Sequence, residues 1–224
     1  MGKIRAVLFD CDGLMFNTER IAQQVWADAA EENGIRLPED FFVRITGAGG
    51  PKELEYIRNV MQNDPLVEEI RQKRFDLEFW SSFQKGELVK KGLEELTDWL
   101  TEHGILIGVA SSSSKDYVKT LLDNTFHPIR YDALCTGDMV RYAKPDPEIF
   151  LLCAQKLDVH PEECLVLEDS RQGIVAAHRA GMHPGFIQDT IVPDEEMLSY
   201  MEYRFEDLSE VIGLLEKEGV CTAS

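Results

Sequence analysis

The sequence predicts an α/β protein in which a helical domain is inserted into a parallel-sheet core. Two observations support this class. Short apolar runs typical of buried strands recur along the chain, and helical patterns lie between them. The first run ends at Phe9 and the next begins at Ile105, which leaves far more residues than one crossover connection needs. An inserted helical domain is the economical explanation of that interval.

Five apolar runs are expected to form the strands of the sheet. The first, from Ile4 to Phe9, is rich in β-branched and aromatic residues and stops at Asp10. That pattern is typical of a strand buried on both faces of a parallel sheet. The other four runs are Ile105–Ala110, Ala133–Cys135, Cys164–Leu167 and the weaker Pro184–Ile187.

Most of the expected helices fall between the first two strands. Within Thr18–Asn33, four apolar residues lie on one stripe and Gly34 follows as a stop, which indicates an amphipathic helix. We therefore expect residues 17–87 to form a helical cap domain, and residues 1–16 and 88–224 to form the catalytic core. The other expected helices are 39–45, 51–62, 65–83, 90–103, 148–157 and 173–180, whereas residues 194–196 and 219–224 are expected to be solvated surface and a frayed end.

Charge and cysteine content limit the classes of partner. The 224 residues include 23 Lys and Arg against 41 Asp and Glu, which gives a formal net charge of −18. Long-range repulsion argues against nucleic acid or an anionic membrane as the main partner, and an anionic substrate would need a local cation. The five cysteines are odd in number and show no C-x-x-C spacing, so we expect a cytoplasmic protein. No apolar run reaches the roughly 18 residues of a membrane span, and nothing indicates the oligomeric state.

Two acidic pairs follow expected strands. Asp10 and Asp12 stand in an Asp-Cys-Asp-Gly turn after the first strand, and Glu168 and Asp169 follow Leu167. Ligands of open parallel sheets bind outside the carboxyl ends of the strands, and Mg²⁺ prefers carboxylate oxygens. Taken singly, the first pair is equally compatible with an ordinary turn, and the second with the N-terminus of a helix.

Hydroxyl groups and one lysine occupy comparable positions. Four serines, Ser111–Ser114, follow the second strand and open a helix, where hydroxyl and backbone N–H groups can bind phosphate oxygens. Helix capping by one serine is the alternative. Lys144 precedes Pro145, which fixes the backbone, so its ammonium group can be presented to a carboxylate and a phosphoryl group. Most lysines, however, are simply solvated.

Together these residues suggest one reaction centre. Asp10 could attack phosphorus and form an aspartyl phosphate, with Mg²⁺ offsetting the charge of the two anions. Asp12 could protonate the leaving oxygen and afterwards activate water. Ser111, adjacent N–H groups and Lys144 could hold the phosphoryl oxygens.

With these motifs in this order, the sequence resembles the haloacid dehalogenase-like hydrolases whose helical cap is inserted after the first motif. The resemblance covers nearly the whole chain and implies a Rossmann-like parallel sheet core with a helical cap. The motifs that support it are Phe9–Leu14 with Thr18 and Glu19, Val109–Ser111, Lys144–Pro147, and Leu167–Ser170 with Gly173 and Gly181.

The resemblance also implies a role for each residue of the site. Asp10 would be the nucleophile, Asp12 the general acid and base, and Mg²⁺ would be bound by the Asp10 carboxylate, the Asp12 main-chain carbonyl and Asp169. Glu168 would be a further metal ligand or, slightly favoured, an acceptor that supports the ligands. We therefore expect a Mg²⁺-dependent phosphatase for a small phosphorylated metabolite such as a sugar phosphate. The expected substrate-binding residues are Ser111, Ser112, Lys144 and Thr18.

Three other functions are weighed against a phosphatase. A phosphosugar mutase of the β-phosphoglucomutase type would have a cap His and a cap Arg where this chain has Ala22 and Gly50. A receiver-type signalling domain uses similar groups in another order, and the four complete motifs argue against a non-catalytic phosphate-binding protein. The loop Gly47–Gly50 is as compatible with a turn between helices as with a substrate contact.

Overall fold

The core of the protein is a parallel sheet of six strands in the order β3-β2-β1-β4-β5-β6. A computed structural model describes residues 4–45 and 51–217, except for the side chains of residues 51–53. The central strand β1 pairs with β2 on one side and with β4 on the other. This order confirms the expected α/β class with a Rossmann-like sheet. The strands are β1 (Ala6–Phe9), β2 (Leu106–Ser111), β3 (Ala133–Thr136), β4 (Cys164–Glu168), β5 (His183–Ile187) and β6 (Tyr203–Phe205).

Five of these strands are the predicted ones, and β6 is a strand that the sequence analysis missed. It has only three residues and pairs with β5 alone, at the edge of the sheet. Its central residue Arg204 is exposed, so no continuous apolar run announces it.

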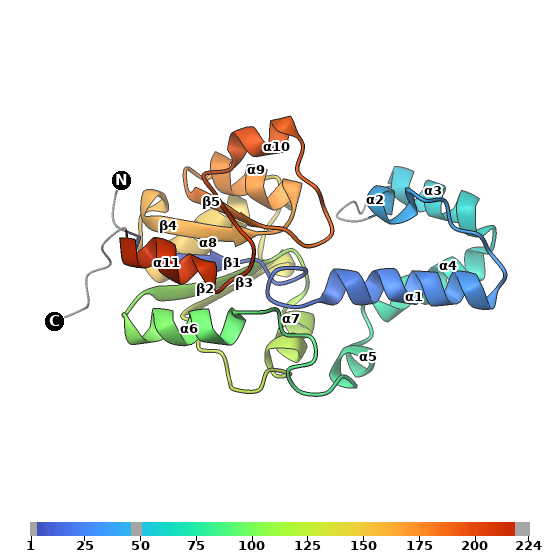
Figure 1. The fold of residues 1–224 in the computed structure, drawn as a ribbon, viewed down its shortest axis with the longest axis horizontal. Coiled ribbons are helices and arrows are strands. Elements are labelled where there is room, and N and C mark those ends of the chain that lie inside the picture. The colour runs from blue at the N-terminus through green and yellow to red at the C-terminus, as the bar shows by residue number, and fades with distance from the viewer. Residues whose placement is uncertain (1–3, 46–50, 218–224) are drawn as a thin grey trace.

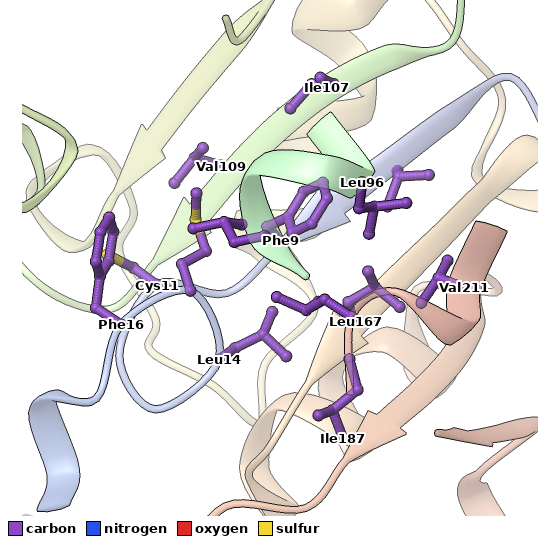
Figure 2. Packing of buried hydrophobic residues seen from close by; sticks show 14 of the residues in the cluster. Phe9, Cys11, Leu14, Phe16, Leu96, Ile107, Val109, Leu167, Ile187 and Val211 are labelled. Carbon is purple, nitrogen blue, oxygen red and sulfur yellow. The ribbon is translucent and has the colours of Figure 1, made fainter. Parts of the chain in front are cut away.

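Helices cover both faces of the sheet because the strand side chains alternate. Val7 and Phe9 of β1 lie in one apolar cluster and Ala6 and Leu8 in another. Figure 2 shows part of the first cluster, which includes Phe9 of β1, Leu96 of α6 and Val211 of α11. The helices of that face are α6 (Leu93–Glu102), α7 (Lys115–Leu122) and α11 (Glu210–Lys217), and those packed in the second cluster are α8 (Glu148–Leu157) and α9 (Arg171–Arg179).

A separate apolar cluster lies among the helices that follow β1. Trp26, Phe41, Met61 and Val67 are buried against one another there, away from the sheet (Figure 1). These helices stand where the cap was expected, although its bounds of residues 17–87 remain a prediction. They are α1 (Thr18–Glu32), α2 (Phe41–Ile45), α3 (Pro51–Met61) and α4 (Asp64–Lys73).

The single helix expected over 65–83 is wrong, because two helices occupy this stretch. Helix α4 ends at Lys73 and α5 (Leu77–Ser81) begins after Asp76. The Asp76 carboxylate accepts hydrogen bonds from two backbone N–H groups of the first turn of α5, which starts a new helix in place of continuing the old one. Helix α5 packs against α7, and its Trp80 belongs to the apolar cluster of the sheet.

The acidic segment 194–196 also forms more structure than expected. Asp194 accepts a hydrogen bond from the backbone N–H of Met197 at 2.9 Å and thereby caps α10 (Glu195–Tyr200). Short 3₁₀ turns at Gly137–Met139 and Pro161–Glu163 complete the regular structure of the described chain. Among the residues that the structure describes, no helix is both long and apolar enough to span a membrane.

Candidate active site

The register of the three central strands, β2, β1 and β4, brings the predicted site residues together at the carboxyl ends of these strands. Phe9 pairs with Val109 of β2 and with Leu167 of β4. The residues that follow these three therefore lie side by side at the carboxyl ends of the strands, and the backbone N–H of Asp10 donates to the Leu167 carbonyl at 3.1 Å. This convergence is the reason why motifs far apart in the sequence meet.

Lys144 lies between the first and last of these motifs. Its Nζ donates to Asp10 Oδ1, to Glu168 Oε1 at 2.6 Å and to the Ala110 carbonyl at 3.0 Å. Only 5% of its side chain is exposed. Burial alone would lower the pKa of Lys144, but the carboxylates of Asp10 and Glu168 raise it above its ordinary value. The lysine is therefore a fixed, buried cation and not a solvated surface residue.

Three buried carboxylates lie close together here, and two of them, Asp10 and Glu168, contact Lys144. Asp10, Glu168 and Asp169 each offer an oxygen, and these oxygens all lie within 4.8 Å of one another. Burial raises the pKa of Asp10 and of Asp169 well above its ordinary value, and the neighbouring carboxylates raise both further. A cluster with more negative than positive charge and only oxygen donors fits a hard divalent cation.

A glycine makes room for this cluster. Gly13 has a φ of +78°, and a Cβ built on it would lie 2.2 Å from Asp169 Oδ2. Both the backbone conformation and the close approach exclude a side chain at position 13. The Gly of the Asp-x-Asp-Gly turn thus lets Asp169 approach the first motif.

Glu168 is held by hydrogen bonds on both of its carboxylate oxygens. Oε1 accepts from Lys144, while Oε2 accepts from the backbone N–H of Asp169 at 3.2 Å and from the N–H and Oγ of Ser170 at 3.1 and 2.8 Å. A Cβ at Gly173 would lie 1.8 Å from the Glu168 carboxyl carbon, so this residue also must be small. These bonds fix the Glu168 carboxylate in place, and its role as a support for the metal ligands stays a prediction.

Asp12 is surrounded by hydroxyl groups. Its Oδ1 accepts from Thr18 Oγ1 at 2.9 Å and from the Tyr117 hydroxyl at 2.7 Å, and its Oδ2 accepts from Ser113 Oγ at 2.7 Å. Burial first, and then the Asp12 carboxylate, raise the pKa of Tyr117 far above its ordinary value, so the phenol stays a donor. The sequence analysis included Ser113 in the run Ser111–Ser114 but did not predict its hydrogen bond to Asp12. It missed Tyr117, to which nothing in the sequence pointed.

The predicted substrate-binding residues are only partly brought together on one surface. Ser112 and Lys144 line a cavity, whereas Ser111 is fully buried and its Oγ accepts from the backbone N–H of Ser113 at 3.0 Å. Thr18 is also buried and contacts Asp12 and the N–H of Gly13. Binding of substrate by these four residues remains a prediction.

The cavity has a volume of about 510 Å³ and lies between this edge of the sheet and the helices α1, α3 and α4. Asp10, Asp12, Lys144 and Asp169 line its core side. Apolar residues dominate the opposite wall of the cavity. This wall also includes three basic residues in the last turn of α4 and just after it. The residues of this wall include Ala22, Trp26, Ile57, Ile70, Arg71, Lys73, Arg74 and Phe75. The loop Gly47–Gly50 lies outside the described residues.

Comparisons with known proteins match most of the chain. The family model described as haloacid dehalogenase-like hydrolase matches residues 4–181. The chain is 33% identical over 213 residues to a Bacillus subtilis protein named "Putative phosphatase YhcW", covering 93% of this chain and 94% of that protein. It is 31% identical over 181 residues to the "Phosphorylated carbohydrates phosphatase" of Thermotoga maritima, covering 80% and 82%.

A solved structure extends the similarity to three dimensions. It is described as a "putative beta-phosphoglucomutase from Thermotoga maritima", and it superposes with a TM-score of 0.74 at 25% sequence identity. The match covers 96% of this chain and 99% of that one. The sheet and the helices α1–α4, here called the cap-side helices, therefore share one arrangement with a protein whose description names a mutase.

Proposed function

Because the chain belongs to the haloacid dehalogenase-like hydrolase family, we propose that it is a Mg²⁺-dependent phosphatase that acts through an aspartyl phosphate. The observation that supports this most is the contact of Lys144 with Asp10 inside a cluster of three buried carboxylates. A carboxylate at the carboxyl end of β1, next to a fixed cation and facing a cavity, is suited to attack phosphorus.

In the first step, an Asp10 carboxylate oxygen forms a bond to phosphorus while the bond from phosphorus to the substrate oxygen breaks. Asp12 gives its proton to that leaving oxygen. Lys144, Ser111 and Ser112 hold the phosphoryl oxygens, on which the transition-state charge spreads. Mg²⁺, held by Asp10, Asp169 and the Asp12 carbonyl, would offset the charge of the two anions.

In the second step, water attacks the phosphorus of the aspartyl phosphate. Asp12, now a carboxylate, takes a proton from that water, and the bond between phosphorus and Asp10 breaks. Inorganic phosphate leaves and the Asp10 carboxylate is restored. One carboxylic acid thus serves as acid and then as base.

The proposed substrate is a small phosphorylated metabolite, and a sugar phosphate is the first choice. A relative that is 31% identical is named for phosphorylated carbohydrates, and the cavity of about 510 Å³ suits a molecule of that size. We place the enzyme in the cytoplasm, since Cys11, Cys135, Cys153 and Cys164 are free thiols.

A mutase is the second candidate, because the similar solved structure is described as one. The cavity wall argues for hydrolysis. Ala22 lines the cavity at the position where the mutases have a histidine, and a methyl group cannot transfer a proton to or from a sugar hydroxyl.

A screen of phosphorylated metabolites for released inorganic phosphate tests the proposal. We expect Mg²⁺-dependent phosphate release from at least one sugar phosphate, and no release by the Asp10→Asn variant. Isomerisation of the sugar phosphate with little free phosphate would instead identify a mutase. Full activity of Asp10→Asn would refute the assigned nucleophile.

A further inference from the structure

The hydroxyl of Tyr117 makes a hydrogen bond to Asp12 for which neither the family motifs nor the proposed reaction gives a reason. Tyr117 belongs to α7, 105 positions along the chain from Asp12, and its hydroxyl donates to Asp12 Oδ1 at 2.7 Å. We propose that Tyr117 is a positioning residue that anchors Asp12 through Oδ1 and leaves Oδ2 to transfer the proton. This inference rests on the proposed phosphatase function.

The two oxygens of Asp12 differ in their surroundings. Oδ1 accepts from Thr18 and Tyr117, which are only 3% and 5% exposed, so its donors are fixed in the protein interior. Oδ2 accepts from Ser113, which lines the cavity. A serine hydroxyl rotates freely and can also accept a hydrogen bond, so it can give way when a substrate oxygen approaches. Oδ2 is therefore the Asp12 oxygen that can exchange its hydrogen bond with Ser113 for one with the substrate.

Packing fixes the direction of the Tyr117 hydroxyl. The ring stands edge-on to Trp80, with centroids 5.6 Å apart and an interplanar angle of 88°. Trp80 is 2% exposed, stacks with Phe83 and donates its Nε1–H to the Arg74 carbonyl at 3.1 Å. A phenol held on a packed ring has few alternative positions, which suits it to orient a carboxylate.

The same packing joins Asp12 to the segment that leads out of the cap-side helices. Arg74 follows α4, lines the cavity and pairs with Glu19 at 3.3 Å. Its backbone carbonyl accepts from Trp80, which contacts Tyr117. Tyr117 is thus the contact through which α5 supports the acid and base of the core.

Proton transfer gives a test that separates positioning from simple structural support. An alkyl phosphate needs a proton on its leaving oxygen, whereas 4-nitrophenyl phosphate releases a stabilised phenolate without one. The ratio kcat/KM includes only the steps up to release of the alcohol. For Tyr117→Phe we expect kcat/KM for glycerol phosphate, or for the best sugar phosphate, to fall about tenfold, and kcat/KM for 4-nitrophenyl phosphate to change less than about twofold.

Tyr142→Phe is the matched control. Tyr142 is 54% exposed and is not among the cavity residues, so the same loss of a phenol hydroxyl should leave both ratios unchanged. An equal fall for both substrates with Tyr117→Phe, or no fall for either, would overturn the positioning role.

Two further measurements keep the test decisive. Thermal unfolding shows whether Tyr117→Phe is folded, and if it is not, Trp80→Phe replaces it, for which we expect the same selective loss. Equal changes for both substrates in that variant would likewise overturn the inference. Failure of the proposed function looks different, because the unmodified enzyme would then release no phosphate from any ester.

Discussion

The two walls of the cavity differ in how far their side chains are exposed to solvent. On the core side, Asp10 is buried and accepts a hydrogen bond from Lys144, whose side chain is only 5% exposed and also donates to the buried Glu168 behind the wall. On the α4 side, Arg71 is 42% exposed at its side chain and Phe75 is 70% exposed. From this difference we infer that the side chains proposed for the chemistry are held in place before substrate arrives. The side chains that would recognise the rest of the substrate remain open to solvent.

The largest expected effect comes from the carboxylate cluster. Asp169→Asn removes one of three carboxylates that can hold a cation, so we expect kcat to fall about a thousandfold, equivalent to several kcal/mol of lost charge stabilisation. Phosphate release at increasing Mg²⁺ measures it, and EDTA should abolish the activity of the unmodified enzyme. Equal activity with and without EDTA would show that the cluster is not a functional metal site.

A smaller but still severe effect is expected at Lys144. Lys144→Met keeps much of the side-chain volume but leaves Asp10 and Glu168 without their buried cation. We expect kcat to fall about a hundredfold, because an electrostatic contact to the phosphoryl group is lost. Steady-state kinetics at saturating Mg²⁺ checks this, with Lys91→Met on the surface as control. A change in KM alone would contradict a role in the transition state.

Gly13 tests how closely the Asp-Cys-Asp-Gly turn must approach Asp169. Gly13→Ala places a Cβ where Asp169 Oδ2 now lies and forces a left-handed backbone on alanine. The conformational strain alone costs about 1–2 kcal/mol of unfolding free energy. We expect the Mg²⁺ concentration for half-maximal activity to rise about tenfold, since Asp169 must shift. Gly34→Ala, with φ +67° but no atom within 4 Å, should lose stability without this change in Mg²⁺ dependence.

The smallest effect is expected on the opposite wall. Arg71→Ala combined with Lys73→Ala removes two cavity-lining cations that lie apart from the carboxylate cluster. We expect KM for a sugar phosphate to rise about threefold to tenfold with kcat nearly unchanged, as for contacts made equally in ground and transition states. A fall in kcat for 4-nitrophenyl phosphate would instead give this wall a share in the chemistry.

The contrast between buried and exposed residues also decides how much of the fold the sequence could predict. Strands buried on both faces, such as Ala6–Phe9, show continuous apolar runs and were predicted. Strand β6 was not, because its short edge position leaves Arg204 exposed. The break between α4 and α5 depends on hydrogen bonds of one side chain, Asp76, within a stretch whose helical pattern continues.

The site divides in a similar way. Asp10 and Asp169 follow neighbouring strands, so topology predicts that they meet, whereas Lys144 was predicted from the proline that comes after it. Tyr117 reaches Asp12 from α7, where its ring packs against Trp80 of α5, and such tertiary contacts have no local signal in the sequence. The basic residues at the end of α4 were missed for the same reason, because their side of the helix faces the cavity only once the helices are packed.

The most direct test of the central claim is to trap the covalent intermediate. The enzyme is mixed with substrate and Mg²⁺, quenched in acid and treated with borohydride, which reduces an acyl phosphate to an alcohol. Peptide mass spectrometry should then find homoserine at position 10, only when both substrate and Mg²⁺ are present. Turnover with an unmodified Asp10 peptide under these conditions, or with the reduced residue at another position, would contradict attack on phosphorus by Asp10.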